Sequence, residues 1–435
     1  MTLSLWLDER SQGFPADSRI IEADLAIVGG GVMGAACAYF AACKSNGQTK
    51  KVVLLDAAQP VNGASGRNAG FVLRGIHTYY DGCVQQYGRE LARHIFSLGE
   101  ENQALLLHFM KSSGGAPAAA FEYDPSGSYL LASSLDELEA LSCSSQLMKE
   151  DGFQQVLLKE DPLDRGFYGA LYNPSDFGVN PVKLVQALLA AAEPQVLAEE
   201  AVRRIDCASG RSGGKISLST TNRTVVCERV ILATNAYSAL LNDYFLDLVS
   251  PVRGQMLATA PLKKRLLDKL CYANFGWEYF RQLPDRRLLV GGCRQRFVDA
   301  EQGYSDLITR PVQQALEHYL RDHFPELAGA PIDYRWSGVM AFTPDGLPLL
   351  GELPEHPGVF FVVGCNGHGL GYSMVLARAA VLLASGQAAA QASGVEFSPL
   401  RATLKGPAKD DARLLGNSRS KAPNGDNDIK MNIGP

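Results

Sequence analysis

The stretch ADLAIVGGGVMGAACAYFAACKSNGQTKKVVLLD, residues 23–56, predicts a strand, a tight turn, a helix and a second strand in that order. Its turn holds Gly29, Gly31 and Gly34 in the spacing G-x-G-x-x-G. Glycines at these positions permit the turn, the approach of backbone to a pyrophosphate, and close packing of helix on sheet. Asp56 ends the second strand, where a carboxylate can hold ribose hydroxyls. This βαβ unit predicts dinucleotide binding, and the motif alone leaves FAD and NAD open.

The composition is typical of a soluble protein with two or three domains. The chain has 435 residues, 46% hydrophobic and 20% charged, with no apolar run long enough to span a bilayer. Its net charge of -5 and its lack of Lys/Arg-rich stretches disfavour nucleic acid as a partner. The nine cysteines are scattered and form no C-x-x-C pair, which argues against a disulfide framework or a zinc site. The first twenty residues contain no secretory signal, so we expect a cytoplasmic protein with no metal and no membrane anchor.

Helix-like and strand-like patterns continue along the rest of the chain. Helices are expected at residues 134–152, 180–194 and 372–386. Strands are expected at residues 229–236, 251–261, 286–293 and 358–367. From residue 396 to 435 the chain is polar and rich in Lys, Asp, Asn, Gly and Pro, which predicts a flexible tail.

Two further glycine-rich segments are candidates for ligand contact. The loop NGASGRNAGF, residues 62–71, exposes backbone that can wrap a phosphate or approach a flat ring, and a solvated loop is the alternative. The segment GCNGHGLGYS, residues 364–373, lies between a strand and a helix, so a second helix N-terminus can face the same ligand and stabilise negative charge. His368 is flanked by glycines, which leaves both close backbone approach and acid–base chemistry open.

Nine blocks in order resemble the D-amino-acid oxidase superfamily of FAD-dependent oxidoreductases, with most similarity to the glycine oxidase, sarcosine oxidase and γ-glutamylputrescine oxidase group. They are SLWLDER, ADLAIVGGGVMG, GASGRNAGF, YNPSDFGVNPVKLVQAL, VILATNAYS, PVRGQMLATAP, EYFRQL with RRLLVGGC, RWSGVMAFTPDGLPLLGELP and GCNGHGLGYS. The resemblance implies an α/β, Rossmann-like FAD-binding domain that is discontinuous, at residues 1–85, 150–238 and 335–395. It also implies an α+β substrate domain with a mostly antiparallel sheet, at residues 86–149 and 239–334.

The same resemblance implies which residues bind FAD. The three glycines of the first turn would take the pyrophosphate and Asp56 the adenosine ribose. Covalent attachment is not expected, because Gly338 and Arg67 stand where relatives with covalent flavin carry cysteine or histidine. The implied FAD-binding residues are Gly29, Gly31, Val32, Met33, Gly34, Asp56, Ala57, Ala64, Ser65, Gly66, Arg67, Asn68, Ala69, Gly70, Val202, Ala233, Thr234, Asn235, Gly367, His368, Gly369 and Leu370.

The substrate side departs from the family pattern. Relatives that oxidise α-amino acids carry an Arg three residues before the TPD threonine, where it clamps the substrate carboxylate, and this chain has Met340 there. Arg74 or Arg281 could replace it, with a structural salt bridge as the alternative for each. Tyr279, Arg281 and His368 are the candidates for catalysis or substrate positioning. The implied substrate residues are Phe71, Arg74, Tyr279, Arg281, Trp336 and Met340, where the aromatic ones could equally be core.

The implied activity is FAD-dependent oxidation of a C–N bond in a primary or secondary amine or amino acid derivative. The product would be an imine that then hydrolyses, with O2 as acceptor and H2O2 as its product. Two alternatives stay open: a dehydrogenase that passes electrons to a quinone or an electron-transfer protein, and a catalytically silent flavoprotein subunit. The oligomeric state is also open.

Overall fold

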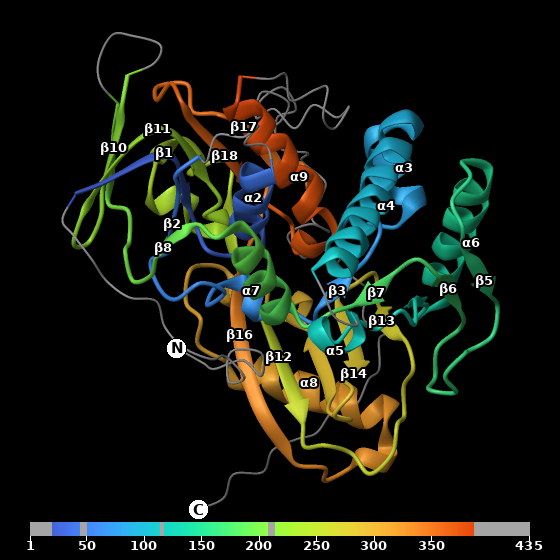
Figure 1. The fold of residues 1–435 in the computed structure, drawn as a ribbon. Coiled ribbons are helices and arrows are strands. Elements are labelled where there is room, and N and C mark those ends of the chain that lie inside the picture. Colours follow the sequence, from blue (N-terminus) through green and yellow to red (C-terminus); the bar gives the residue numbers. More distant parts are fainter. Residues whose placement is uncertain (1–19, 44–49, 114–116, 208–213, 387–435) are drawn as a thin grey trace, which may run out of the picture.

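The computed structural model describes residues 20–43, 50–113, 117–207 and 214–386, which form two large sheets with helices packed on them (Figure 1). This mixed architecture confirms the predicted α/β class. The predicted tail, residues 396–435, and the SLWLDER block lie outside the described residues.

The first sheet is built around a parallel core. Its strand order is β17-β18-β11-β1-β2-β8, and β10 and β9 extend it through antiparallel pairing from β11. β1 lies parallel to both β11 and β2, and β2 is buried along its whole length, as expected for strands covered on both faces. The strands are β1 (Ile20–Val28), β2 (Val52–Leu55), β8 (Gln195–Leu197), β9 (Arg204–Cys207), β10 (Ile216–Ser219), β11 (Thr224–Leu232), β17 (Leu349–Glu352) and β18 (Val359–Val363).

Three apolar helices lie together on this sheet: α2 (Val32–Cys43), α7 (Pro181–Ala192) and α9 (Gly369–Ala384) (Figure 1). Buried alanines on α2 let its neighbours approach closely, because they add little bulk to the interface. The start of α7 follows a local signal, since the side chain of Asn180 accepts hydrogen bonds from the backbone N–H groups of Val182 and Lys183. Among the described helices, none is long and apolar enough to cross a membrane.

The second sheet has the order β16-β12-β15-β14-β13-β4-β6-β5, and its neighbouring strands are antiparallel except for the pair β13–β4. Helix α8 (Arg310–His323) covers one face with its buried Val312, Leu316 and Leu320. The strands are β4 (Ser128–Leu131), β5 (Val156–Leu158), β6 (Ala170–Asn173), β12 (Ser250–Thr259), β13 (Leu270–Ala273), β14 (Glu278–Gln282), β15 (Leu288–Gly292) and β16 (Ile332–Phe342).

The remaining elements connect the two sheets. β3 (Phe71–Val72) and β7 (Phe177–Gly178) pair as a two-stranded ribbon, and each of them lies on a segment of chain that passes from one sheet to the other. Helix α4 packs against α9. The connecting helices are α3 (Tyr80–Tyr87), α4 (Arg89–Ser112), α5 (Pro117–Phe121) and α6 (Leu135–Glu150).

Sheet membership differs from the predicted domain boundaries in two places. β5 and β6 fall within residues 150–238, and most of β16 falls within residues 335–395, both assigned to the FAD-binding domain from the sequence. In the structure β6 pairs with β4, and β16 pairs with β12 along its length, so these strands belong to the second sheet. The reason is backbone pairing between distant segments, which local patterns do not record.

Candidate active site

One cavity of about 1830 Å³ joins the two halves of the molecule. It is lined by the loops at the carboxyl ends of the parallel strands β1, β2 and β11, which meet at one edge of the first sheet. Residues of β12, β13, β14 and β16 in the second sheet line it as well. Sites for one small ligand occupy roughly 300–1,000 Å³, so this cavity has room for a dinucleotide and a small substrate together.

The first glycine turn has no room for side chains. Gly29 has φ +112°, and a Cβ on it would lie 2.5 Å from the carbonyl oxygen of Ala233. A Cβ on Gly34 would lie 1.8 Å from the carbonyl oxygen of Gly29, so helix and strand touch backbone to backbone. The Val32 N–H, at the N-terminus of α2, donates to Ser65 Oγ at 2.9 Å. The turn therefore directs backbone donors and the positive end of the helix dipole toward the cavity.

Asp56 lies at the end of β2 and is fixed by backbone donors. Its Oδ2 accepts from the Gly30 N–H at 2.7 Å and its Oδ1 from the Ala58 N–H at 2.8 Å. Burial raises the pKa of this carboxyl to about 6, while the two N–H groups act to lower it. Asp56 and Val202 both line the cavity. Each oxygen of the Asp56 carboxylate accepts from one N–H group, so lone pairs are left for ligand hydroxyls.

We expect Asp56→Asn to raise the dissociation constant for FAD by about 10- to 100-fold. The side-chain amide of Asn has a single oxygen, so it cannot accept hydrogen bonds at both positions as the two carboxylate oxygens of Asp56 do. A lost hydrogen bond to a charged group costs about 1.5–3 kcal/mol. Titration of the apoprotein with FAD, followed by flavin fluorescence, measures the change. Asp24→Asn is the matched control, because Asp24 on the neighbouring strand β1 accepts from the Lys51 N–H at the surface. Equal affinities for both variants and the wild type would contradict this role for Asp56.

The loop at residues 62–70 is tied to β16 of the second sheet. Arg67 Nη1 donates to the carbonyl oxygen of Ser337 at 2.9 Å, and Trp336 Nε1 donates to the carbonyl oxygen of Arg67 at 2.9 Å. Asn68 closes the loop on itself by donating to the carbonyl oxygen of Ser65 at 2.8 Å and accepting from the Gly70 N–H at 2.7 Å. Of this loop, Gly66 and Gly70 lie outside the cavity lining, and the residues that line the cavity are Asn62, Gly63, Ala64, Ser65, Arg67, Asn68 and Ala69.

The second glycine-rich segment meets the first sheet at the same edge. Asn235 Oδ1 accepts from the N–H groups of Gly364 and Cys365, which ties the end of β11 to the end of β18. His368 precedes α9, and its Nδ1 lies 3.1 Å from the carbonyl oxygen of Asn366, to which it can donate as a neutral imidazole. Burial lowers the pKa of His368, so the ring is neutral at pH 7. This segment therefore presents a neutral, backbone-rich wall, lined by Gly367, His368, Gly369 and Leu370.

Comparison with known proteins identifies the cofactor for which this site is built. The family profile described as "FAD dependent oxidoreductase" matches residues 24–383. The chain belongs to the DAO family of FAD-dependent oxidoreductases. Its cofactor is therefore FAD, and the side-chain-free glycine turn, the carboxylate at Asp56 and the size of the cavity fit that molecule.

Individual relatives share about a quarter of their residues with this DAO-family chain. A probable oxidoreductase, OrdL, of Rhizobium meliloti is 26% identical, with 82% of each chain covered. γ-Glutamylputrescine oxidoreductase of Escherichia coli is 26% identical over 85% of each chain. The crystal structure of glycine oxidase from Geobacillus kaustophilus superposes with a TM-score of 0.70 at 23% identity, covering 88% of this chain and 99% of that one.

The substrate end of the flavoenzyme's cavity is lined with aromatic rings from the second sheet. The ring of Tyr279 on β14 covers Gly291 on the paired strand β15, where a Cβ would lie 2.2 Å from the ring. Tyr272 stacks on Tyr279 with ring centroids 5.6 Å apart, and Phe71 lies 5.4 Å from Tyr272. Met340 approaches Gly367, whose Cβ position is 3.6 Å from its sulfur. These contacts bring the predicted substrate residues Phe71, Tyr279 and Met340 to one end of the cavity.

The two predicted arginines have other partners. Arg74 lines the cavity, but its Nη1 pairs with Glu100 at 2.5 Å and its Nη2 donates to Asn173 Oδ1 at 3.0 Å. Arg281 lies outside the cavity lining, with its guanidinium 3.3 Å from the carbonyl oxygen of Gly70 and 3.5 Å from Asp124. Trp336 also lies outside the lining and is fully buried. Arg281 and Trp336 thus hold the loop at residues 62–70, and Arg74 ties the cavity wall to α4 and β6, so the donors of these side chains are engaged by protein groups.

Sequence reasoning did not find Arg294, Trp277, Phe342 or His77, all of which line the cavity. His77 Nδ1 has no hydrogen-bond partner in the described part of the chain, and burial together with His368 lowers its pKa to about 3. Arg294 follows the glycine pair that ends β15, a position with no motif of its own. Within the described ranges no group of three or more His, Cys, Asp or Glu side chains is arranged to hold a metal ion.

Proposed function

We propose that this enzyme oxidises the C–N bond of a primary or secondary amine or amino acid derivative to an imine. The observation that carries the proposal is a single cavity that joins the dinucleotide-binding edge of the first sheet to an aromatic pocket on the second. Relatives named glycine oxidase and γ-glutamylputrescine oxidoreductase support it. The cytoplasmic location expected from the sequence is part of the same proposal.

Oxidation removes two electrons and two protons from the CH–NH unit, and water then hydrolyses the imine to a carbonyl compound and an amine. FAD, when bound, supplies the acceptor for the hydride equivalent. The protein provides a pocket that desolvates the amine, since Tyr272, Tyr279 and Phe71 enclose it with ring surface. A dry pocket favours the neutral amine, whose lone pair is needed for the reaction.

We expect the rate of flavin reduction by substrate to rise with pH between about 7 and 10. Deprotonating an amine of pKa about 10.4 at pH 7 costs about 3.4 × 1.36, or roughly 4.6 kcal/mol, and this cost falls as pH rises. Burial raises the pKa of Tyr279 to about 12 and lowers that of His368, so neither changes charge in this window. Stopped-flow reduction across the pH range measures the profile. A flat profile would mean that amine deprotonation does not limit the reaction.

Anaerobic bleaching of the oxidised flavin band, near about 450 nm, tests the reaction itself. The holoenzyme is mixed with amino acids, N-methyl amines and polyamine derivatives, with alcohols of matching carbon skeleton as controls. Bleaching by amines alone supports C–N oxidation. Holoenzyme that no amine bleaches contradicts the proposal and favours the silent flavoprotein subunit.

Admission of air after bleaching then identifies the electron acceptor. Rapid return of the yellow colour with formation of one H2O2 per turnover supports an oxidase, since O2 takes up two electrons and two protons. Return of the colour only with an added quinone favours the dehydrogenase alternative.

A further inference from the structure

Arg294 is held between two aromatic rings at the substrate end of the cavity. Its guanidinium carbon lies 4.3 Å from the ring centroid of Trp277 and 4.8 Å from that of Phe342. Stacking of this kind fixes the plane of a guanidinium without using its N–H donors. Phe342 also faces the Gly367 segment, where its Cζ is 3.9 Å from the Cβ position of that glycine. The cation therefore lies beside the Met340 and Gly367 wall.

The N–H donors of the Arg294 side chain have no partner among the described residues. In the described part of the chain, its guanidinium makes no hydrogen bond and no ion pair. Glu301 interacts with Arg294 only through its charge, which acts to raise the pKa of Arg294. The Glu301 carboxylate accepts hydrogen bonds from Arg253 Nε at 2.7 Å and Arg253 Nη2 at 2.8 Å. Arg294 is half-buried, whereas the fully buried arginines of the described chain all have oxygen partners: Arg67, Arg74, Arg253 and Arg281.

The backbone at Arg294 is set by two consecutive residues in the left-handed region. Gly292 has φ +121° and Cys293 has φ +60°, and together they end β15 and begin the turn at Arg294–Arg296. A non-glycine residue in this conformation costs about 1–2 kcal/mol, and such strain is concentrated at functional sites. The strained turn thus places an unpaired cation on the cavity wall.

We infer that Arg294 binds a carboxylate of the substrate, so that the enzyme selects amines that also carry this group. The inference rests on the proposed C–N oxidation and names its substrate class. An arginine fork matches the two oxygens of a carboxylate, whereas the neighbouring Met340 on β16 offers no hydrogen-bond donor. Recognition therefore comes from the end of β15 instead of from β16.

One carboxylate suits the charge at this end of the cavity better than a dianionic phosphate does. Burial lowers the pKa of Arg294 to about 10, so it remains a cation at pH 7. The neighbouring His77 and His368 are neutral there, because burial lowers the pKa of each. The two buried arginines that line the cavity have protein partners, since Arg67 donates to the carbonyl oxygen of Ser337 and Arg74 is paired with Glu100. A single positive charge thus complements a single negative one.

Binding of carboxylates that carry no amine tests the inference without requiring turnover. Linear carboxylates from acetate to hexanoate, and their neutral primary amides, are titrated into the FAD-loaded enzyme by calorimetry. We expect the wild type to prefer the best carboxylate over its amide by about 10- to 100-fold, the range for a charge-assisted hydrogen-bond pair. Arg294→Gln should remove this preference, and Arg294→Lys should keep part of it.

Arg310→Gln is the matched control for net charge. Arg310 is exposed at the start of α8, outside the cavity lining, so this variant should bind carboxylates as the wild type does. The visible flavin spectrum and the melting temperature verify that each variant is folded and holds FAD. A carboxylate preference that survives in Arg294→Gln overturns the inference, as does a wild type with no preference.

The rate of flavin reduction is compared for pairs of amines that differ only in whether they carry a carboxylate. This comparison tests the role of Arg294 independently of the proposed C–N oxidation. Reduction that depends on neither the carboxylate nor Arg294 overturns the inference and leaves C–N oxidation standing. Arg294-dependent carboxylate binding in an enzyme that no amine reduces overturns C–N oxidation and supports the binding role of Arg294.

Discussion

Gly34→Ala is expected to yield a protein that retains almost no FAD, with at least about a 100-fold weaker affinity, and that unfolds at a lower temperature. The added Cβ would lie 1.8 Å from the carbonyl oxygen of Gly29 and 3.4 Å from Ile27 Cγ2. The nearest of these atoms belongs to backbone, so no side chain can rotate to relieve the overlap. Helix α2 must then move away from β1, which displaces the N–H groups that face the cofactor.

FAD content after purification and thermal unfolding with and without added FAD measure this effect. Gly63→Ala is the control for the melting temperature without FAD, because φ at Gly63 is -76° and no atom lies within 4 Å of its Cβ position. If Gly34→Ala bound FAD as tightly as the wild type and melted without FAD at the temperature of Gly63→Ala, backbone contact between helix and strand would not be needed for cofactor binding.

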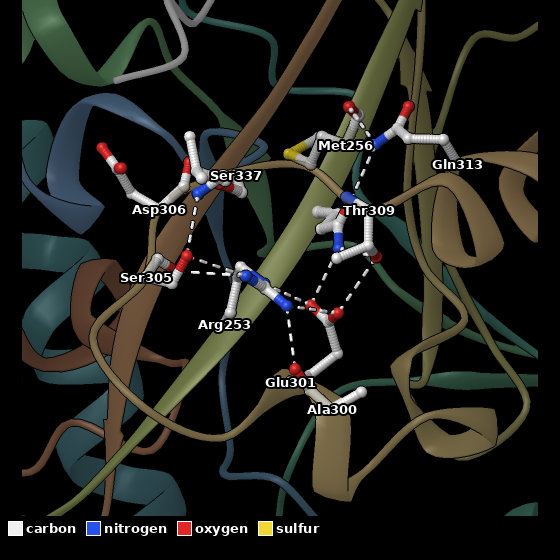
Figure 2. Close-up of polar contacts among 11 residues, drawn as sticks. Arg253, Met256, Ala300, Glu301, Ser305, Asp306, Thr309, Gln313 and Ser337 are labelled. Carbon is white, nitrogen blue, oxygen red and sulfur yellow. Dashed lines mark hydrogen bonds and ion pairs between the residues drawn. The ribbon is translucent and has the colours of Figure 1, made fainter.

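Glu301→Ala is expected to lower the free energy of unfolding by about 3–5 kcal/mol, since removing one member of a buried ion pair leaves the other charge without compensation. Arg253 and Glu301 are 6% and 1% exposed. Beyond the two bonds from Arg253, Glu301 accepts from Thr309 Oγ1 at 3.2 Å (Figure 2). Glu301 also accepts from Gln255 Nε2 at 2.8 Å. All four of these donors would lose the Glu301 carboxylate together, while Arg253 Nη2 would keep the carbonyl oxygen of Ala300 and Gln255 Nε2 would keep Thr309 Oγ1.

The same cluster connects the second sheet to the flavin loop. Arg253 Nη1 donates to Ser305 Oγ at 3.2 Å, and Ser337 Oγ donates to the carbonyl oxygen of Asp306 (Figure 2). Ser337 in turn accepts from Arg67 through its carbonyl oxygen. Loss of Glu301 should therefore also loosen the segment that runs from Arg294 to Thr309, and weaken carboxylate binding at the cavity.

Denaturant titration of the FAD-loaded protein measures the change in stability. Glu317→Ala is the matched control, because its ion pair with Arg335 is 2.8 Å long but about a third exposed on both sides, a setting worth at most about 1 kcal/mol. The double variant Arg253→Met with Glu301→Leu should recover most of the loss, since an apolar pair removes the buried charge altogether. A Glu301→Ala variant as stable as Glu317→Ala would contradict the account.

The cofactor half of the molecule was predictable because its signals are local in the chain. Gly29, Gly31 and Gly34 lie within six residues, and Asp56 follows at the end of the next strand. Each is needed for a backbone reason that holds wherever a strand, a turn and a helix meet. The start of α7 was equally readable, since Asn180 and Pro181 form a capping signal by themselves. Sequence alone thus determined the α/β class, the family resemblance and the cofactor.

The substrate half depended on contacts between residues far apart in the chain. Arg281 lies within β14 and Arg294 follows the glycines that end β15, and neither position shows from the local sequence what its guanidinium contacts. Only the tertiary structure shows that Arg281 is enclosed by the carbonyl oxygens of Ala69, Gly70 and Val179. Arg294 instead lies over the rings of Trp277 and Phe342, and its donors have no partner among the described residues. The membership of β5, β6 and β16 in the second sheet was likewise decided by pairing with distant strands. The physical reason is the same in both cases. A charged side chain or a strand edge forms its hydrogen bonds with groups that the folded chain brings near it, and the residues next to it in the sequence do not indicate which groups these are.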